Sequence, residues 1–266
     1  MTKVAAIQMN SLAEPEDNFL QAVALLRQAR DQGAVLALLP EMFLSMDGKR
    51  YQDLARDLSW VDRLGDVARD LGLWLVAGAV PQPAPDPAEP RVRSACLVFD
   101  DQGELVARYD KVHLFDVAVG DSQGQYRESE RFCPGDAVVV VDTPAGRLGL
   151  SICYDLRFAE LYRLLREQGA ELLAVPAAFT WKTGAAHWEI LLRARAIEQQ
   201  CYLLAADQCG WHDSRRQTWG HSQIIDPWGT TLAQLEHEPG VVCSNIDLAE
   251  LQHLRQNMPV VEHRRF

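Results

Sequence analysis

Short aliphatic runs alternate with a helical segment at the start of the chain, and this alternation constrains the fold more than any other feature. The runs "KVAAIQM" and "AVLALLP" have the β-branched and aliphatic character of strands. Between them, Phe19, Val23, Leu26 and Arg30 recur at helical spacing, and Gly33 closes the segment. A strand, a helix and a second strand in this order are typical of an α/β fold.

The rest of the chain continues this mixture of strands, helices and hairpins. We expect further strands in "LWLVAGAV", "RVRSACLVFD", "ELVARYDKVHL", "AELLAVP", "CYLLAAD", "SQIIDP" and "GVVCSNID", and a hairpin in "AVVVVDTPAGRLGLSIC". Helices are expected over about residues 53–71 and 158–168, and in "AAHWEILLRARAIEQQ" and "LAELQHLRQNM". These segments indicate an α/β protein with one mixed sheet or two packed sheets, and they leave the strand order open.

Composition limits the classes of protein to which the chain can belong. It has 266 residues, of which 48% are hydrophobic and 24% charged, and no linker interrupts it, so we predict a single domain over residues 1–266. The formal net charge of -11 argues against a nucleic-acid surface. Met1 is not followed by a secretory signal, and no apolar run approaches the roughly 18 residues that span a bilayer. We therefore expect a cytoplasmic protein that does not bind a membrane.

The six cysteines lack the spacing of a metal site. They stand at positions 96, 133, 153, 201, 209 and 243, without a C-x-x-C pair or zinc-finger spacing. In a reducing compartment six free thiols are expected, most of them structural.

A proline-rich segment, "PQPAPDPAEP" at residues 81–90, excludes a helix interior or a central strand. We favour an exposed hairpin tip over a partner-binding proline motif for this segment.

Three ionisable residues follow hydrophobic runs: Glu41 after "LALLP", Lys111 after "ELVARYD" and Cys153 after "GLSI". Because ligands bind at the carboxyl ends of strands in α/β sheets, these three could converge in one pocket. Cys153 lies in a strand-to-turn-to-helix setting, where a helix start would favour a thiolate nucleophile. Taken singly, each residue also fits an interpretation without a function: Cys153 as a packed thiol, Glu41 as a surface carboxylate and Lys111 as a solvated lysine.

Together, "LLPEMF", "YDKVHLFD" and "GLSICYDLRFAEL" resemble the Glu, Lys and Cys signatures of the nitrilase superfamily of carbon–nitrogen hydrolases, in the same order. The resemblance runs from "VAAIQM" to "VVEHRRF". The blocks "TGAAHWEILLRARAIEQQCY" and "GHSQIIDPWGT" are most similar to the branch that contains deaminated glutathione amidases and omega-amidases. This resemblance implies a four-layer α-β-β-α sandwich of two mixed sheets with helices outside. It also implies a homodimer or higher homo-oligomer, and no cofactor or metal.

The resemblance further implies an amidase that converts the ω-amide of an α-keto acid to a carboxylic acid and ammonia through a cysteine thioester. Deaminated glutathione is the first candidate substrate, and α-ketoglutaramate or α-ketosuccinamate the second. Another amidase, nitrilase or carbamoylase of the superfamily is an alternative, and so is a catalytically silent scaffold or binding member. The intact Glu41, Lys111 and Cys153 set argues against a silent member.

By the same resemblance, Cys153 is the nucleophile, Glu41 the general base and Lys111 the cation that stabilises the oxyanion. Glu128 is assigned a supporting role, with Glu130 as its nearby competitor.

The backbone N–H of Tyr154 is expected to join Lys111 in the oxyanion hole. Arg157 is the leading candidate for binding a substrate carboxylate, because a guanidinium pairs with a carboxylate bidentately. Weaker candidates are Phe179, Thr183 and His187, and His187 is expected to orient the following helix rather than act as a base.

Two features depart from the family pattern or stand outside it. Trp181 and Lys182 replace smaller or differently charged residues, which leaves the acyl-side specificity open. Residues 211–219 form a basic, aromatic loop that contains Arg215 and Arg216. This loop could bind the far carboxylate of a glutathione-like substrate or form a dimer contact.

Overall fold

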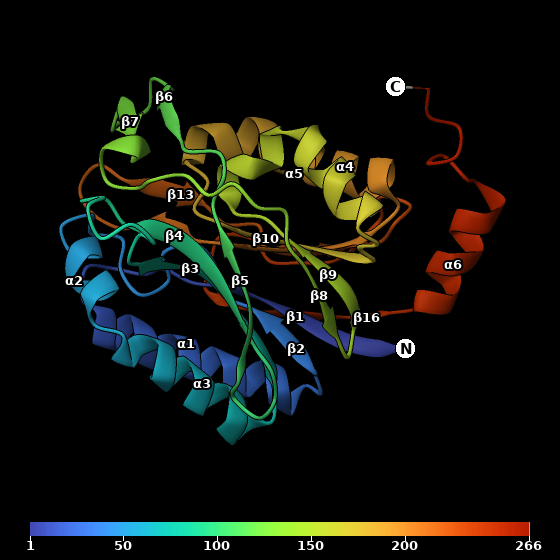
Figure 1. Ribbon diagram of the computed structural model, residues 1–266, viewed down its shortest axis with the longest axis horizontal. Coiled ribbons are helices and arrows are strands. Elements are labelled where there is room, and N and C mark those ends of the chain that lie inside the picture. The colour runs from blue at the N-terminus through green and yellow to red at the C-terminus, as the bar shows by residue number, and fades with distance from the viewer. Residues whose placement is uncertain (266) are drawn as a thin grey trace.

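Two six-stranded sheets lie face to face in the computed structural model, which describes residues 1–265 (Figure 1). The first sheet has the order β16-β1-β2-β3-β4-β5, in which β1, β2 and β3 are parallel and the other strands are antiparallel to their neighbours. Its strands are β1 (Thr2–Gln8), β2 (Leu36–Leu38), β3 (Trp74–Gln82), β4 (Arg93–Phe99), β5 (Leu105–Asp110) and β16 (Gly240–Ile246).

The second sheet repeats this arrangement, with a parallel centre and antiparallel flanks. Its order is β15-β14-β11-β10-β9-β8, and β9, β10 and β11 are parallel. Its strands are β8 (Val140–Thr143), β9 (Gly146–Leu150), β10 (Leu172–Ala177), β11 (Tyr202–Asp207), β14 (Gln223–Ile225) and β15 (Thr231–Gln234). Two small hairpins, missed by the sequence analysis, pair β6 (Asp116–Ala118) with β7 (Gln125–Arg127) and β12 (Cys209–Trp211) with β13 (Gln217–Trp219).

Helices cover the outer faces of both sheets, which completes the predicted four-layer α-β-β-α sandwich (Figure 1). Helices α1 (Pro15–Asp31) and α3 (Ser59–Leu71) cover the first sheet, and α4 (Ala159–Glu167) and α5 (Trp181–Gln199) cover the second. Helix α6 (Leu248–Asn257) lies beyond one edge of the layers. The remaining helical segments are α2 (Tyr51–Arg56) and the 3-10 turns η1 (Glu128–Glu130) and η2 (Cys153–Arg157). No helix within residues 1–265 is long and apolar enough to cross a membrane.

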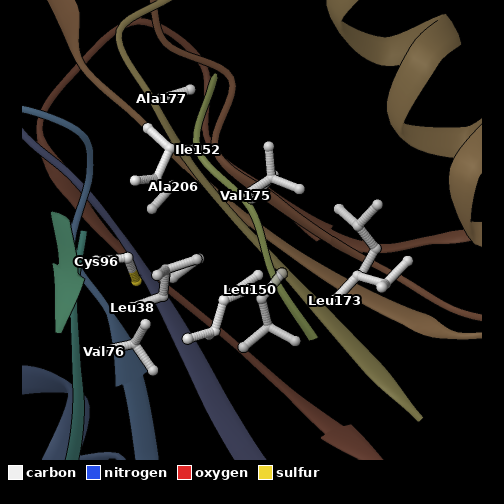
Figure 2. Packing of buried hydrophobic residues seen from close by; sticks show 14 of the residues in the cluster. Leu38, Val76, Cys96, Leu150, Ile152, Leu173, Val175, Ala177 and Ala206 are labelled. Carbon is white, nitrogen blue, oxygen red and sulfur yellow. The ribbon is translucent and has the colours of Figure 1, made fainter. Parts of the chain in front are cut away.

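The first sheet is apolar on both faces, because each face packs against another layer. Leu36 and Leu38 of β2 belong to the core between the sheets, whereas Ala37 between them belongs to the core under α1 and α3. Figure 2 shows the intersheet core, where Leu38, Val76 and Cys96 of the first sheet share a cluster with residues of the second sheet such as Leu150 and Val175. A strand buried on both faces reads as a continuous aliphatic run, which is why "AVLALLP" shows no alternation.

Two predicted helices differ from the structure at their boundaries. The helix expected over about residues 53–71 is two helices, because Asp57 accepts hydrogen bonds from Ser59 N at 3.1 Å and Ser59 Oγ at 2.6 Å and so interrupts the first helix. Helix α5 begins at Trp181, four residues before the predicted "AAHWE" start. Thr180 caps this end by accepting a hydrogen bond from Thr183 N.

The proline-rich segment connects two antiparallel strands, as predicted. The exclusion of a central strand is wrong for Pro81 and Gln82, which end β3 and pair there with β4 alone; β4 begins at Arg93, so the rest of the segment is the tip of this pair. Its residues are mostly exposed.

Candidate active site

Glu41, Lys111 and Cys153 meet at one edge of the two sheets. They follow β2, β5 and β9, respectively, by no more than three residues. Strand β5 is antiparallel to β4, which is antiparallel to β3, so β5 runs in the same direction as β3 and β2 and ends at the same edge. All three side chains line a single cavity of about 120 Å³. The predicted convergence of these strand ends is therefore observed in the structure.

One ammonium group faces two buried carboxylates in this cavity. Lys111 Nζ donates hydrogen bonds to Glu41 Oε1 at 2.7 Å and to both Glu128 oxygens at 2.9 and 3.0 Å. The Lys111 side chain is only 2% exposed, and Glu41 is 6% exposed. Burial opposes the charge of Lys111, but Glu128 and Glu41 outweigh it and raise the pKa of Lys111 well above its ordinary value. Lys111 therefore stays cationic at neutral pH.

Glu128 occupies the position that the sequence assigned to a supporting carboxylate. It begins the turn η1, and its Oε2 accepts a hydrogen bond from Phe115 N at 2.6 Å. Burial raises the pKa of Glu128, while Lys111 opposes this rise. Glu130 is exposed to solvent. The competition between the two residues for a place beside Lys111 is thus resolved in favour of Glu128.

Cys153 begins the turn η2 with a φ of +49°, in the left-handed region that few non-glycine residues adopt. It is 8% exposed. Burial raises the pKa of its thiol well above the ordinary value. A hydrogen bond with Glu41 and the negative charge of Glu41 add to this rise, whereas Lys111 and the Ala178 N–H oppose it. A helix does follow, α4 from Ala159, but the expectation that its start favours a thiolate at Cys153 is wrong, because Cys153 lies in the short turn η2 and burial favours the neutral thiol.

A buried carboxylate that the sequence analysis did not single out fixes this turn in place. Asp155 accepts hydrogen bonds from Ile152 N at 2.9 Å, His113 N at 3.0 Å and the Tyr109 hydroxyl at 2.7 Å. His113 Nδ1 lies 2.7 Å from the same carboxylate. Asp155 therefore joins the segment of Lys111 to the segment of Cys153. The two motifs "YDKVHLFD" and "CYDLRF" contain the side chains of this network.

The predicted substrate-binding residues gather around the same cavity. Tyr154, Arg157, Phe179 and Thr183 line it. The Arg157 guanidinium carbon lies 5.4 Å from the centre of the Phe179 ring and 5.7 Å from that of Tyr154. His187 reaches the site through Arg157, since its Nδ1 lies 3.2 Å from Arg157 Nη1. The expectation that His187 orients a following helix is wrong, because His187 lies within α5 and Thr180 caps that helix; His187 contacts Arg157 instead.

Several residues of the cavity wall lay outside the predicted site. Tyr51 from α2, Tyr126 from β7 and Arg216 from the 211–219 loop all line the cavity, and so do Arg127 and Arg131. Only the loop of Arg216 carried a sequence signal, the basic and aromatic character noted above. These side chains add positive charge to the cavity of a chain whose net charge is -11.

The two residues that depart from the family pattern line a separate hollow. Trp181 and Lys182 lie at the start of α5, where the hollow is bounded also by Asp121, Ser122 and Gln217. Lys182 Nζ donates a hydrogen bond to Gly120 O at 3.2 Å.

Residues 1–265 contain no group of three or more His, Cys, Asp or Glu side chains placed to hold a metal ion.

Comparison with known proteins is consistent across the whole chain. Residues 3–256 match the carbon-nitrogen hydrolase family. The chain is 42% identical to the deaminated glutathione amidase of Yersinia enterocolitica, over 99% of this chain and 93% of that protein. It is 37% identical to human omega-amidase, over 99% of this chain and 95% of that protein.

The fold is similar to the crystal structure of the Caenorhabditis elegans NitFhit protein, with a TM-score of 0.91 at 40% identity. That match covers 99% of this chain and 65% of the longer NitFhit chain. The sequence family, the relatives and the sandwich fold agree with one another. The chain therefore belongs to the carbon–nitrogen hydrolase family, within the nitrilase superfamily, and is a hydrolase of carbon–nitrogen bonds.

Proposed function

We propose that this protein is an amidase that hydrolyses the ω-amide of an α-keto acid, with deaminated glutathione as its foremost substrate. The observation that carries the proposal is the buried arrangement of Glu41, Lys111 and Glu128 around the Cys153 thiol. The 42% identity to a deaminated glutathione amidase supports the choice of substrate.

The first half-reaction forms a thioester. Cys153 Sγ attacks the amide carbon while Glu41 takes the thiol proton, and the carbonyl oxygen gains negative charge. Lys111 Nζ and the Tyr154 backbone N–H stabilise that oxyanion. Glu41 then passes the proton to the amide nitrogen, the carbon–nitrogen bond breaks, and the amine leaves. Because the pKa of Cys153 is raised, the thiol stays protonated until Glu41 removes its proton in the attack.

The second half-reaction hydrolyses the thioester. Glu41 removes a proton from a water molecule that attacks the thioester carbon, and the same two groups again stabilise the oxyanion. The carbon–sulfur bond then breaks, Cys153 Sγ recovers the proton, and the carboxylic acid leaves. Glu128 holds Lys111 in position through two hydrogen bonds during both halves.

The amine product depends on the substrate. The amide nitrogen of deaminated glutathione belongs to cysteinylglycine, so that substrate yields the dipeptide as its amine. The expectation of ammonia as the product is therefore wrong for deaminated glutathione and holds only for unsubstituted amides such as α-ketoglutaramate. In both substrates a carboxylate lies next to the keto group, and we assign its recognition to Arg157, with Phe179 and Thr183 forming the adjacent wall.

Omega-amidase activity is the second candidate, because the chain is 37% identical to human omega-amidase. To rank the two activities, kcat/KM is measured by mass spectrometry for deaminated glutathione, α-ketoglutaramate, α-ketosuccinamate and a simple nitrile. We expect the highest value for deaminated glutathione.

The nucleophile is tested with a matched pair of variants. Cys153→Ala is expected to abolish turnover and the acyl-enzyme mass. Cys243→Ala, which alters a thiol on β16, is expected to retain wild-type activity. If the wild type hydrolyses none of the four compounds, the proposed activity is wrong.

We further propose that residues 1–266 act as one hydrolase domain in a cytoplasmic homodimer. The core that joins both sheets and the family match over residues 3–256 support one domain, and six free cysteines fit a reducing compartment. Exposed apolar side chains on and beside α5 support a subunit contact through that outer face, with Ile190 70% and Trp228 65% exposed. Analytical ultracentrifugation of the wild type and of Ile190→Glu tests the contact: we expect a dimer that the substitution dissociates.

A further inference from the structure

Arg216 brings a positive charge into the cavity, and the hydrolytic steps above do not use this charge. It lines the cavity, is partly buried, and interacts with the Tyr51 hydroxyl. Ion pairs within residues 1–265 do not include Arg216, whereas Lys111 in the same cavity has two carboxylate partners. A partly buried guanidinium that no carboxylate of these described residues pairs with is available to bind an anion in the cavity.

The backbone around Arg216 is fixed before any ligand arrives. Asp213 Oδ1 accepts a hydrogen bond from Arg216 N at 2.8 Å, and the Arg216 carbonyl accepts one from His212 N at 3.0 Å. The His212 ring lies 2.7 Å from both Ser11 O and Thr218 Oγ1. The loop that carries Arg216 is therefore joined to β13 and to the segment after β1. A charge held by such a loop is preorganised, so binding loses little conformational entropy.

Arg216 and Arg157 enter the cavity with different neighbours. Arg157 packs over the Tyr154 and Phe179 rings, close to the nucleophile turn in sequence. Arg216 instead contacts Tyr51 of α2. Two guanidinium groups with separate surroundings in one cavity suit a substrate with two separated carboxylates.

We propose that Arg216 binds a carboxylate on the leaving amine of the substrate, and that it thereby selects N-substituted amides over unsubstituted ones. In deaminated glutathione this group is the glycine carboxylate. An unsubstituted amide such as α-ketoglutaramate has no carboxylate on its leaving group and gains nothing from Arg216. The assignment rests on the proposed amidase function, and it makes Arg216 a specificity-determining residue without a part in proton transfer.

The test combines a change in the enzyme with a change in the substrate. Arg216→Gln and wild type are assayed with deaminated glutathione, with its C-terminal glycinamide analogue, which lacks the far carboxylate, and with α-ketoglutaramate. For deaminated glutathione we expect Arg216→Gln to lower kcat/KM by about tenfold to a hundredfold, mainly through KM. The loss is expected to exceed the loss for α-ketoglutaramate by at least about tenfold.

The glycinamide analogue completes a thermodynamic cycle of two enzymes and two substrates, which isolates the interaction between Arg216 and the glycine carboxylate. With the wild type, kcat/KM for the glycinamide should be lower than for deaminated glutathione by a factor similar to the loss caused by Arg216→Gln. With Arg216→Gln, kcat/KM for the two substrates should be nearly equal. Arg215→Gln is the matched control, because Arg215 is the exposed neighbour in the same loop, and it should behave as wild type. Arg216→Lys should recover part of the loss, because it restores the charge without the bidentate geometry.

Equal losses for all three substrates would show a structural role for Arg216 and overturn the proposal, as would an unchanged preference for deaminated glutathione over its glycinamide. Wild-type enzyme that hydrolyses none of the three would instead refute the proposed function itself. Circular dichroism and thermal unfolding of each variant distinguish a misfolded protein from one with altered specificity, and Arg216→Lys provides the test if Arg216→Gln does not fold.

Discussion

Replacing Glu41 with glutamine separates two consequences of its charge. The glutamine keeps the size of the side chain, and its amide oxygen can still accept a hydrogen bond from Lys111. Lys111 also keeps its bonds to Glu128 at 2.9 and 3.0 Å, so the buried cation remains paired. The substitution removes the group that we assign as the general base. It also removes a negative charge that raises the pKa of Cys153.

These two consequences have opposite signs, which makes the prediction specific. Loss of a general base lowers kcat by about 10²-fold to 10⁴-fold. Loss of the neighbouring negative charge lowers the pKa of Cys153, because that charge opposes formation of the thiolate. Glu41→Gln should therefore lose turnover while its thiol forms a thiolate at lower pH than in the wild type.

The assay measures kcat for deaminated glutathione and the pH dependence of Cys153 alkylation by iodoacetamide. Both proteins carry Cys243→Ala, because Cys243 is the one cysteine within residues 1–265 that is half-buried, whereas the other five are buried. Glu130→Gln is the matched control, since this exposed carboxylate should alter neither quantity. The reasoning is refuted if Glu41→Gln keeps more than a tenth of the wild-type kcat, or if its alkylation midpoint moves to higher pH.

Three further predictions concern stability. Lys111→Met leaves the Glu41 and Glu128 carboxylates buried without their cation, so urea unfolding should show a loss of about 3 to 5 kcal/mol; a loss below about 1 kcal/mol would contradict the buried pairing. Asp155→Ala leaves the buried N–H of Ile152 and the Tyr109 hydroxyl without their acceptor, and we expect a loss of about 2 to 4 kcal/mol, together with a fall in kcat that Asp155→Asn partly restores. Burial lowers the pKa of His212 to about 4, so between pH 6.5 and 4 the unfolded chain binds a proton that the folded chain does not, and stability falls as the pH falls. Between pH 7 and 4.5 the unfolding free energy should accordingly fall by about 2 to 3 kcal/mol less in His212→Gln than in the wild type. Equal changes in the two proteins would contradict a lowered pKa of His212.

Local signals in the sequence were enough to find the elements and the centre of the site. Aliphatic runs predict strands such as β2, and the residues that follow such runs, Glu41, Lys111 and Cys153, line one cavity in the structure. This works because a strand end is a local feature and parallel strands end at one edge of a sheet. Boundaries were less accurate, since the Asp57 turn and the Thr180 cap depend on individual side-chain hydrogen bonds.

The sequence by itself determined the alternation of strands and helices, the family signatures and the identity of the three central side chains, because periodicity and motif order act over short stretches of chain. Tertiary structure alone decided which carboxylate pairs with Lys111, how Asp155 joins two segments, and that Arg216 reaches the cavity. It also decided that the Cys153 thiol has a raised pKa, which reversed a prediction made from local structure. Contacts between residues tens of positions apart, and the desolvation of charges, are set by how the two sheets pack, and no local pattern encodes that packing.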